Sequence, residues 1–304
     1  MLRMLRARGN RATPERVHYG QRGYQVFRNV FDPAEVEALA GLVRSAADYE
    51  GKLLRKDGSV STHDFFEGTR IVRNPLANFH LPLCNDVAAL SASLRNLLTV
   101  PELADHLRRL DGAESYIIHQ SLVFFAAQTT ELHIDSWGVD TSPRGCAHTL
   151  WVPLQDMHYR AGVPAVVPWP LGEVVTEADL GLTADGTVAE RYEHYHQAFA
   201  RRILEGRPEL VTAFLNRGDL VVWSSLTPHL TLPSMPFPIE RLSLQVLLKP
   251  TALRRGTFLE QPEKWYPERA IRASEDIFLY VPENIHSLFG IDGDGTYAAN
   301  PEDR

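Results

Sequence analysis

Residues 217–229 read Arg-Gly-Asp-Leu-Val-Val-Trp-Ser-Ser-Leu-Thr-Pro-His, and they give the clearest indication of the fold. Gly218-Asp219 is typical of a turn, and the apolar residues up to Trp223 indicate a buried strand. A short connection then presents His229. Beyond it, residues 241–248 form another apolar run that begins with an arginine. This stretch therefore predicts two strands with a histidine between them.

Short β-rich runs of the same kind recur through the middle of the chain, separated by Gly, Pro, Asp and Ser. They cover residues 115–127, 147–154, 163–168, 219–224 and 241–248. This pattern predicts a mainly β fold, an antiparallel barrel or jelly roll, over residues 114–250. An insertion at 171–215 interrupts it, and its second half has helical spacing. That helix either faces the core or forms a lid over a site at the barrel mouth.

The flanks of this barrel are expected to belong to the same single domain, 1–304. We predict a strand at 24–30, a helix capped by Asp32 with Pro33 at its first position, and helices near 86–98 and 101–110. Residues 51–80 resemble a polar loop. The arginine-rich residues 1–18 predict a disordered N-terminus, with a transit peptide as the alternative. We expect residues 251–304 to pack on the barrel.

Composition limits the kind of partner. The formal net charge of −7 argues against nucleic acid or an anionic membrane, because both bind basic surfaces. The two cysteines are too few for a disulfide framework and favour a reducing, cytoplasmic setting. No apolar run approaches the roughly 18 residues that span a bilayer. A small-molecule partner is the remaining expectation.

A histidine and an aspartate two residues apart, His133 and Asp135, form the central candidate site. On a strand they share a face, while Ile134 lies on the other. With 12 histidines and 38 acidic residues in 304, one or two such pairs arise by chance. Together with His229, however, they give the two imidazoles and one carboxylate that non-haem iron prefers. The same ligands also suit zinc in a cupin-type ligand-binding protein.

Arg241 begins an apolar strand, where a guanidinium is costly to bury without an anionic partner. A dicarboxylate would supply one, held by two parallel hydrogen bonds. A structural acid, Glu240 or Asp219, is the alternative partner.

These motifs occur in a recognisable order. His133-x-Asp135 is followed by a strand with Trp151 and Pro153-Leu154, by Gly162-Val-Pro-Ala-Val-Val-Pro168, by the Gly218-Asp219 turn, and by His229 with Arg241 twelve residues later. This order resembles the phytanoyl-CoA dioxygenase family over residues 20–250, most strongly at 131–168 and 217–248. The family implies a double-stranded β-helix (jelly roll, cupin-like) that uses Fe(II), 2-oxoglutarate and O2.

The resemblance implies a role for each motif residue. His133, Asp135 and His229 would bind iron, and Arg241 would hold the far carboxylate of 2-oxoglutarate. Thr231 and Trp151 match family positions near that cosubstrate. Ser243, on the same strand face as Arg241, and Gln120, on the strand that enters the site, are further candidates. Packing or turn hydrogen bonds explain all four nearly as well. The family chemistry would release succinate and CO2. Because related halogenases replace the carboxylate by a small residue, Asp135 favours hydroxylation, or desaturation, epimerisation or ring closure.

The substrate side is less defined. Many family members have Pro-Gly-Ser-His after the third core strand, where this chain has Val167-Pro-Trp-Pro-Leu-Gly172, so the pocket wall there differs. Four residues are candidates for substrate contact: Trp137, His63, Arg70 and Arg144. His194 and His196 are expected to be solvated, since positions i and i+2 of a helix do not share a face. A small polar metabolite or a natural-product or sugar-acid intermediate is the expected substrate.

Overall fold

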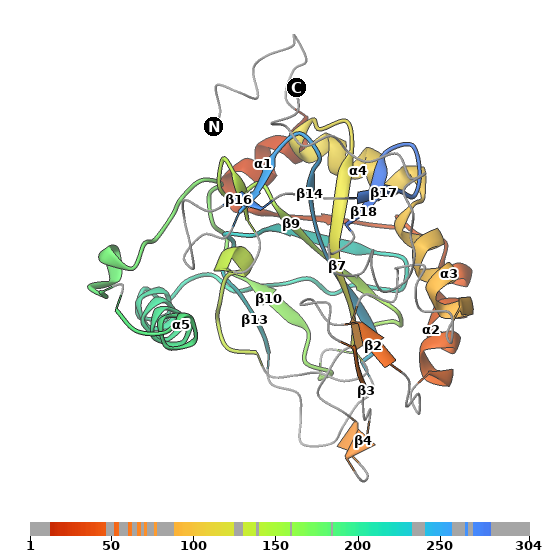
Figure 1. Cartoon of the computed structure of the whole chain (residues 1–304), viewed down its shortest axis with the longest axis horizontal. Helices are drawn as coiled ribbons and strands as arrows, with labels where there is room; N and C mark the ends of the chain where they lie inside the picture. Colours follow the sequence, from red (N-terminus) through yellow and green to blue (C-terminus); the bar gives the residue numbers. More distant parts are fainter. Residues whose placement is uncertain are drawn as a thin grey trace.

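The described part of the chain is a set of β-sheets flanked by helices (Figure 1). The computed structural model describes residues 13–46, 52–54, 60–62, 66–67, 70–71, 76–77, 88–124, 130–137, 140–158, 160–183, 185–232, 241–256, 265–266 and 270–280. Its helices are α1 (Pro14–Arg22), α2 (Pro33–Ser45), α3 (Ala88–Leu98), α4 (Pro101–Asp111) and α5 (Val188–Glu205), with 3-10 turns η3 (Asp135–Trp137) and η4 (Ala178–Leu180).

The strands fall into one large sheet and several small ones. They are β1 (Tyr24–Phe27), β2 (Lys52–Leu54), β3 (Val60–Thr62), β4 (Phe66–Glu67), β5 (Arg70–Ile71), β6 (Leu76–Ala77), β7 (Tyr116–Phe124), β8 (Asp140–Ser142), β9 (His148–Pro153), β10 (Pro164–Val166), β11 (Val211–Thr212), β12 (Leu220–Ser224), β13 (His229–Thr231), β14 (Ser243–Pro250), β15 (Arg254–Gly256), β16 (Trp265–Tyr266), β17 (Ala270–Arg272) and β18 (Ile277–Tyr280). The five predicted β-rich runs correspond to β7, β9, β10, β12 and β14, and the strand predicted at 24–30 corresponds to β1. The strands β2 to β6 lie where a loop was expected.

The large sheet has eight strands in the order β1-β12-β9-β14-β7-β18-β17, with β6 also beside β7. Its central pairs are antiparallel, and β18 joins β7 in parallel. A second sheet has the order β11-β10-β13, and a backbone bridge between His133 and His229 extends it. A third sheet has the order β16-β15-β8. In it, β15, which follows β14 in the chain, pairs with β8, which follows η3.

One face of the large sheet is closed by helices. Leu150 of β9, Val222 of β12 and Val246 of β14 are fully buried there. They belong to one apolar cluster with leucines of α2, α3 and α4. Because side chains alternate along a strand, the intervening residues point to the opposite face, where the site described below lies.

The sequence explains how the helices begin. Asp32 caps α2 as predicted, accepting a hydrogen bond from the Ala34 amide at 2.8 Å, and Pro33 occupies the first turn. The expectation of a disordered residue 1–18 segment is wrong for its end, because α1 starts at Pro14. Thr13 accepts a hydrogen bond from the Arg16 amide as its cap. Residues 1–12 lie outside the described part.

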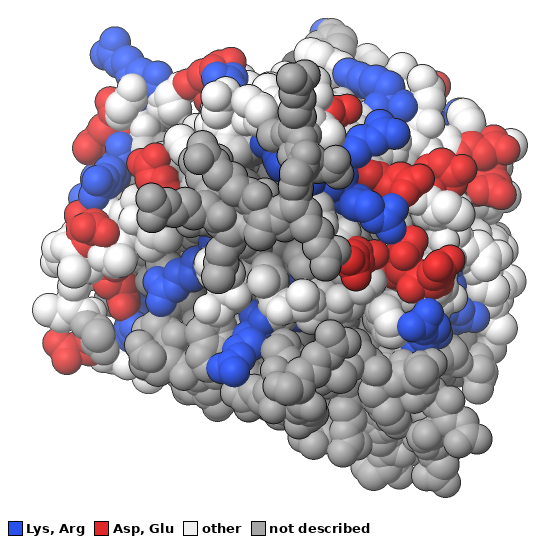
Figure 2. Space-filling view, turned by 90° about the horizontal axis from the view of Figure 1, so that it is seen from above, with Lys and Arg blue, Asp and Glu red and all other residues white. Residues whose placement is uncertain are grey.

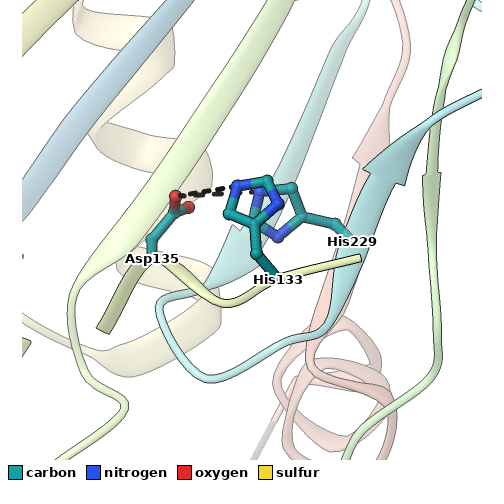
Figure 3. A group of neighbouring side chains, drawn as sticks. All are labelled: His133, Asp135 and His229. Carbon is teal, nitrogen blue, oxygen red and sulfur yellow. Dashed lines mark ion pairs between the residues drawn. The ribbon is translucent and has the colours of Figure 1, made fainter. Parts of the chain in front are cut away.

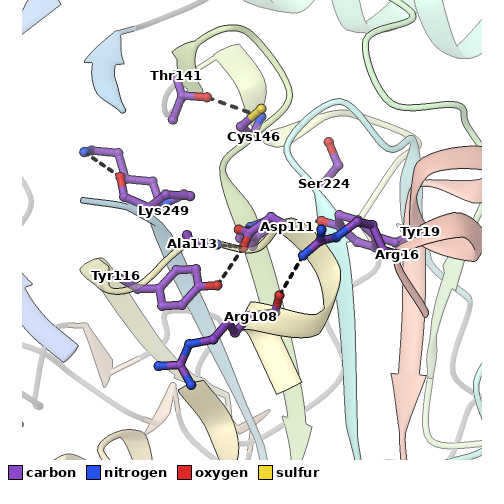
Figure 4. A network of polar contacts seen from close by, with 12 residues as sticks. Arg16, Tyr19, Arg108, Asp111, Ala113, Tyr116, Thr141, Cys146, Ser224 and Lys249 are labelled. Carbon is purple, nitrogen blue, oxygen red and sulfur yellow. Dashed lines mark hydrogen bonds and ion pairs between the residues drawn. The ribbon is translucent and has the colours of Figure 1, made fainter. Parts of the chain in front are cut away.

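A buried polar network fastens α1 and α4 to the sheet (Figure 4). The Tyr19 hydroxyl lies 2.7 Å from His148 Nδ1, and His148 Nε2 lies 2.7 Å from Asp111 Oδ2. Tyr116 donates to the other oxygen of Asp111 at 2.7 Å. Burial, and then the charge of Asp111, raises the pKa of Tyr19, so its hydroxyl keeps its proton. This network joins helices to strand β9 in addition to apolar packing.

Helix α5, within the insertion, lies beside β10 and β13, across the sheets from α2 and α3 (Figure 1). Thr187 and Glu190 form a capping box at its start. Tyr195, Phe199 and Ile203 are buried in a second apolar cluster with Leu132 and Ile134. The helix thus packs against the segment that carries His133 and Asp135.

Candidate metal and cosubstrate site

Three side chains from two distant segments converge at one point (Figure 3). The Oδ1 atom of Asp135 lies 3.9 Å from His133 Nε2 and 3.7 Å from His229 Nε2. The ligand atoms of all three lie within 4.8 Å of one another, so one ion with bonds of about 2.1 Å can bridge them. His133 lies in a bridge rather than a long strand, and Asp135 begins η3, yet the pair still converges as predicted.

The second ring nitrogens of both histidines face backbone carbonyls. His133 Nδ1 lies 2.8 Å from the carbonyl oxygen of Glu131, and His229 Nδ1 lies 3.0 Å from that of Thr227. A carbonyl only accepts, so each Nδ1 carries the proton and each Nε2 keeps a lone pair. Burial, and then the neighbouring His229, lowers the pKa of His133 to about 4, which keeps it neutral near pH 7. Both rings are therefore oriented as metal ligands.

Asp135 is held by hydrogen bonds to its other oxygen. Thr149 Oγ1 donates to Asp135 Oδ2 at 2.6 Å, and Trp223 Nε1 donates to it at 3.1 Å. Burial alone would raise the pKa of Asp135, but the two imidazoles and these donors outweigh it and lower that pKa. The carboxylate is thus ionised, with Oδ1 turned toward the histidines.

A cavity of about 270 Å³ opens beside these ligands. The residues that line it come from both sheets: Leu122, Phe124, Thr130, His133, Trp151, Pro164, Trp223, His229, Leu230, Thr231, Arg241 and Gln245. It is mostly apolar, and Arg241 is the cationic side chain among these lining residues. Such a cavity, with few polar groups, suits a small ligand.

Arg241 is buried, with 3% of its surface exposed, and burial lowers its pKa to about 10. Its Nη1 donates to the carbonyl of Gly162, and its guanidinium carbon lies 5.9 Å from the Trp151 ring centroid. Asp219, one acid considered as its partner, instead accepts a hydrogen bond from Arg28 at 2.6 Å. Glu240 lies outside the described residues. The charge of Arg241 thus faces a cavity next to the metal ligands.

The other predicted cosubstrate residues differ in position. Thr231 and Trp151 line the cavity. Ser243 lies on the same face of β14 as the lining Gln245, and its buried hydroxyl has no hydrogen-bond partner among the described residues. Gln120 shares a face of β7 with Leu122 but is not among the lining residues. An orphaned hydroxyl and a buried guanidinium together fit a bound carboxylate.

Two of the candidate substrate residues have described side chains, Trp137 and Arg144, and neither lines the cavity. Trp137 is buried against α5, with its ring centroid 5.8 Å from that of Tyr195. Arg144 follows β8, in a turn, and does not line the cavity. His63 lies outside the described residues, and for Arg70 only the backbone in β5 is described. A contact between these four residues and the substrate therefore stays a prediction.

The position of His196 differs from the prediction. We expected it to be solvated, but it is 8% exposed, and its ring centroid lies 6.2 Å from that of His133. Its Nδ1 lies 2.8 Å from the Tyr192 carbonyl oxygen, and its Nε2 has no hydrogen-bond partner among the described residues. His194 is exposed as expected. The buried stripe Tyr195–Phe199 was the available signal, because His196 lies beside it on the helix.

Comparison with known proteins identifies the family. The family model described as Phytanoyl-CoA dioxygenase (PhyH) matches residues 19–234, which is more than half of the chain. The chain belongs to the phytanoyl-CoA dioxygenase family. It is therefore a non-haem Fe(II)/2-oxoglutarate-dependent oxygenase on a double-stranded β-helix, as the motif order predicted. No curated protein is similar enough in sequence to count as a relative. Arg241 lies beyond the matched range.

Solved structures share this fold. The non-heme α-ketoglutarate-dependent carbocyclase SnoK from nogalamycin biosynthesis superposes with a TM-score of 0.54 at 18% identity, covering 81% of this chain and 86% of that one. The epimerase SnoN in complex with Fe3+, α-ketoglutarate and nogalamycin RO gives 0.53 at 20%, covering 79% and 84%. AviO1 from Streptomyces viridochromogenes Tue57 gives 0.52 at 16%, covering 79% and 96%. At these identities the likeness concerns the fold alone.

The surface charge and the helices can be compared with the expectation of no nucleic-acid or membrane partner. On the face shown in Figure 2, basic and acidic side chains of the described residues lie interspersed. None of the helices that the structure describes has both the length and the apolar character needed to cross a bilayer.

Proposed function

We propose that His133, Asp135 and His229 hold the iron of this oxygenase, and that the enzyme hydroxylates a small organic substrate. The observation that carries the proposal is the convergence of Oδ1 of Asp135 and the two Nε2 atoms within 4.8 Å. Two neutral imidazoles and one carboxylate are the donor set that leaves iron open positions for other ligands. When bound, iron and 2-oxoglutarate activate O2 for oxidation of a C–H bond, releasing succinate and CO2.

The cavity supports a second assignment, in which Arg241 binds the distal carboxylate of 2-oxoglutarate. Its planar guanidinium suits a bidentate carboxylate, and Trp151 stacks near it at 5.9 Å. Thr231 and Ser243 would add hydroxyl donors, and Gln120 stays a weaker candidate. Burial of this charge strengthens its attraction to the cosubstrate, because little water competes for the guanidinium.

Helix α5 and the insertion 171–215 would cover the site on one side. Tyr192 and His196 of α5 have ring centroids 4.2 Å apart, and Tyr192 lies edge-on to Trp137 at 5.5 Å. This wall is aromatic rather than arginine-lined, which fits an uncharged part of a small metabolite or natural-product intermediate better than an acidic group. Excluding water there protects the reacting centre.

The test is succinate formation from 2-oxoglutarate with added Fe(II). We expect slow succinate release without substrate, and its loss in His133→Ala, because one metal ligand is gone. His194→Ala is the matched control, since His194 is an exposed histidine on α5, and it should retain turnover. Turnover in His133→Ala equal to wild type would disprove the ligand assignment. A screen of small metabolites, read as faster succinate release, then identifies the substrate.

A further inference from the structure

A second buried carboxylate, Asp140 of β8, lies between the segments that carry the proposed metal ligands. It is 1% exposed and accepts four hydrogen bonds. Its Oδ2 accepts from Ser136 Oγ at 2.6 Å, and its Oδ1 accepts from Ser225 Oγ at 3.0 Å. The amides of Thr141 and Gly145 each donate to Oδ1 at 2.8 Å. These four hydrogen bonds come from the local backbone and from the two serines.

Ser136 directly follows one proposed ligand, and Ser225 lies four residues before another. Ser136 directly follows Asp135 in η3, and its amide donates to the Ser225 carbonyl at 2.9 Å. Ser225 begins the connection from β12 to His229, whose ring is fixed by the Thr227 carbonyl at 3.0 Å. Asp140 therefore bonds simultaneously to the turn after one ligand and to the connection before another.

We infer that Asp140 is a positioning residue, which sets the metal affinity by holding the Asp135 turn and the His229 connection at a fixed separation. The inference rests on the proposed function, because it takes these residues as ligands. Partners that orient ligands typically change metal affinity by about 10–100-fold when they are removed. Asp140 itself touches no ligand directly in the hydrogen bonds described.

Its protonation supports this role. Burial raises the pKa of Asp140, although Ser136 and the other donors partly offset it. The folded state therefore disfavours the ionised form of Asp140. The contribution of Asp140 to the free energy of unfolding consequently falls as the pH rises through this raised pKa. The role of the Asp140 carboxylate is therefore to hold its hydrogen-bond donors in place rather than to stabilise the fold.

The experiment is a titration of the full chain with Co(II), which takes the same ligands as Fe(II) and is followed by its visible absorption. We expect Asp140→Ala to weaken Co(II) binding by about 10–100-fold and to shift the absorption bands. Asp140→Asn should recover most of the affinity, because its amide can still accept from the backbone and pair with Ser136. Wild-type affinity and bands in Asp140→Ala would overturn the inference.

Asp219→Ala is the matched control. Asp219 is a 3% exposed aspartate at the opposite end of β12, bonded to Arg28 and to the amides of Asn29 and Asn216. Its loss should lower the melting temperature and leave Co(II) affinity unchanged. An equal loss of affinity in Asp219→Ala would reduce the Asp140 effect to general destabilisation and overturn the inference.

Milder variants keep the test decisive if Asp140→Ala does not fold. Ser136→Ala and Ser225→Ala each remove one hydroxyl bonded to Asp140, and each should weaken Co(II) binding. Unchanged affinity in both contradicts the inference. Should wild type bind no Co(II), or His133→Ala bind it equally well, the proposed function itself fails rather than the role of Asp140.

Discussion

The two faces of the eight-stranded sheet carry the same strands but opposite chemistry. Toward the helices, Leu150, Val222 and Val246 are fully buried in one apolar cluster. Toward the second sheet, the neighbouring residues Thr149 and Trp223 donate hydrogen bonds to Asp135. One face is filled, and the other surrounds a cavity of about 270 Å³.

The two faces therefore contribute differently to stability and to function. Residues of the filled face contribute free energy of folding through burial, so changes there should lower stability. Residues of the cavity face orient ligands or face an open volume, so changes there should alter binding instead. Residues 149 and 150 lie side by side in β9, one on each face, which makes the division testable.

The largest effect is expected at the filled face. Leu150→Ala should lower the free energy of unfolding by about 2–5 kcal/mol, because it leaves a cavity in a packed core. Urea unfolding measures this, and Co(II) titration of the folded variant should give wild-type affinity. Weaker metal binding with unchanged stability would contradict the division between the faces.

Arg241→Ala should raise the 2-oxoglutarate concentration needed for half-maximal succinate release by about 100-fold, since it removes the buried charge that we propose binds the carboxylate. Arg241→Lys should fall between this variant and wild type, because an ammonium lacks the planar fork. The Fe(II) requirement should change little. Arg28→Ala, a half-exposed arginine bonded to Asp219, is the control. An unchanged 2-oxoglutarate requirement in Arg241→Ala would refute its role.

Trp223→Phe should weaken Co(II) binding by about tenfold, because the ring stays but the donor to Asp135 Oδ2 is lost. Thr149→Val, which removes the other donor, should also weaken Co(II) binding, in contrast to Leu150→Ala at the adjacent position. Trp169→Phe removes an indole bond to the Glu173 carbonyl and should leave metal binding unchanged. Equal affinity in wild type and Trp223→Phe argues against orientation of Asp135 by this bond.

Ser243→Ala should have the smallest effect. Its buried hydroxyl has no partner among the described residues, so removing it should change the free energy of unfolding by about 1 kcal/mol or less. The 2-oxoglutarate requirement should rise severalfold if the hydroxyl donates to the cosubstrate. Enzyme kinetics with 2-oxoglutarate as the varied component measures this, and no rise removes Ser243 from the binding site.

Local signals in the sequence predicted part of this molecule well. The cap at Asp32, the turn at Gly218 and the apolar strands depend on neighbouring residues, and the structure confirms them. The convergence of His133, Asp135 and His229 followed from spacing together with the order of the motifs. The cap, the turn and the strands need no knowledge of distant contacts, whereas the convergence joins distant segments and was expected from the family resemblance.

What sequence reasoning missed depends on contacts between distant segments. Arg16 lies in the segment that was expected to be disordered, but its Nη2 donates to the Arg108 carbonyl of α4 at 3.1 Å. His196 is buried only because α5 packs on the His133 segment. Gln245 lines the cavity but was not predicted to do so. It could have been found, because it shares a strand face with Ser243. Helical and strand periodicity describe a face but do not say what covers it.

The backbone bridge between His133 and His229 has a consequence for remodelling this enzyme. Each amide donates to the other's carbonyl, at 3.0 and 2.9 Å, so this backbone pairing holds the two histidines side by side. Asp135 belongs instead to a separate 3-10 turn. We therefore expect that Asp135, the third proposed ligand, can be replaced by a smaller side chain, leaving room for an exogenous anion, while the two histidines keep their relative positions.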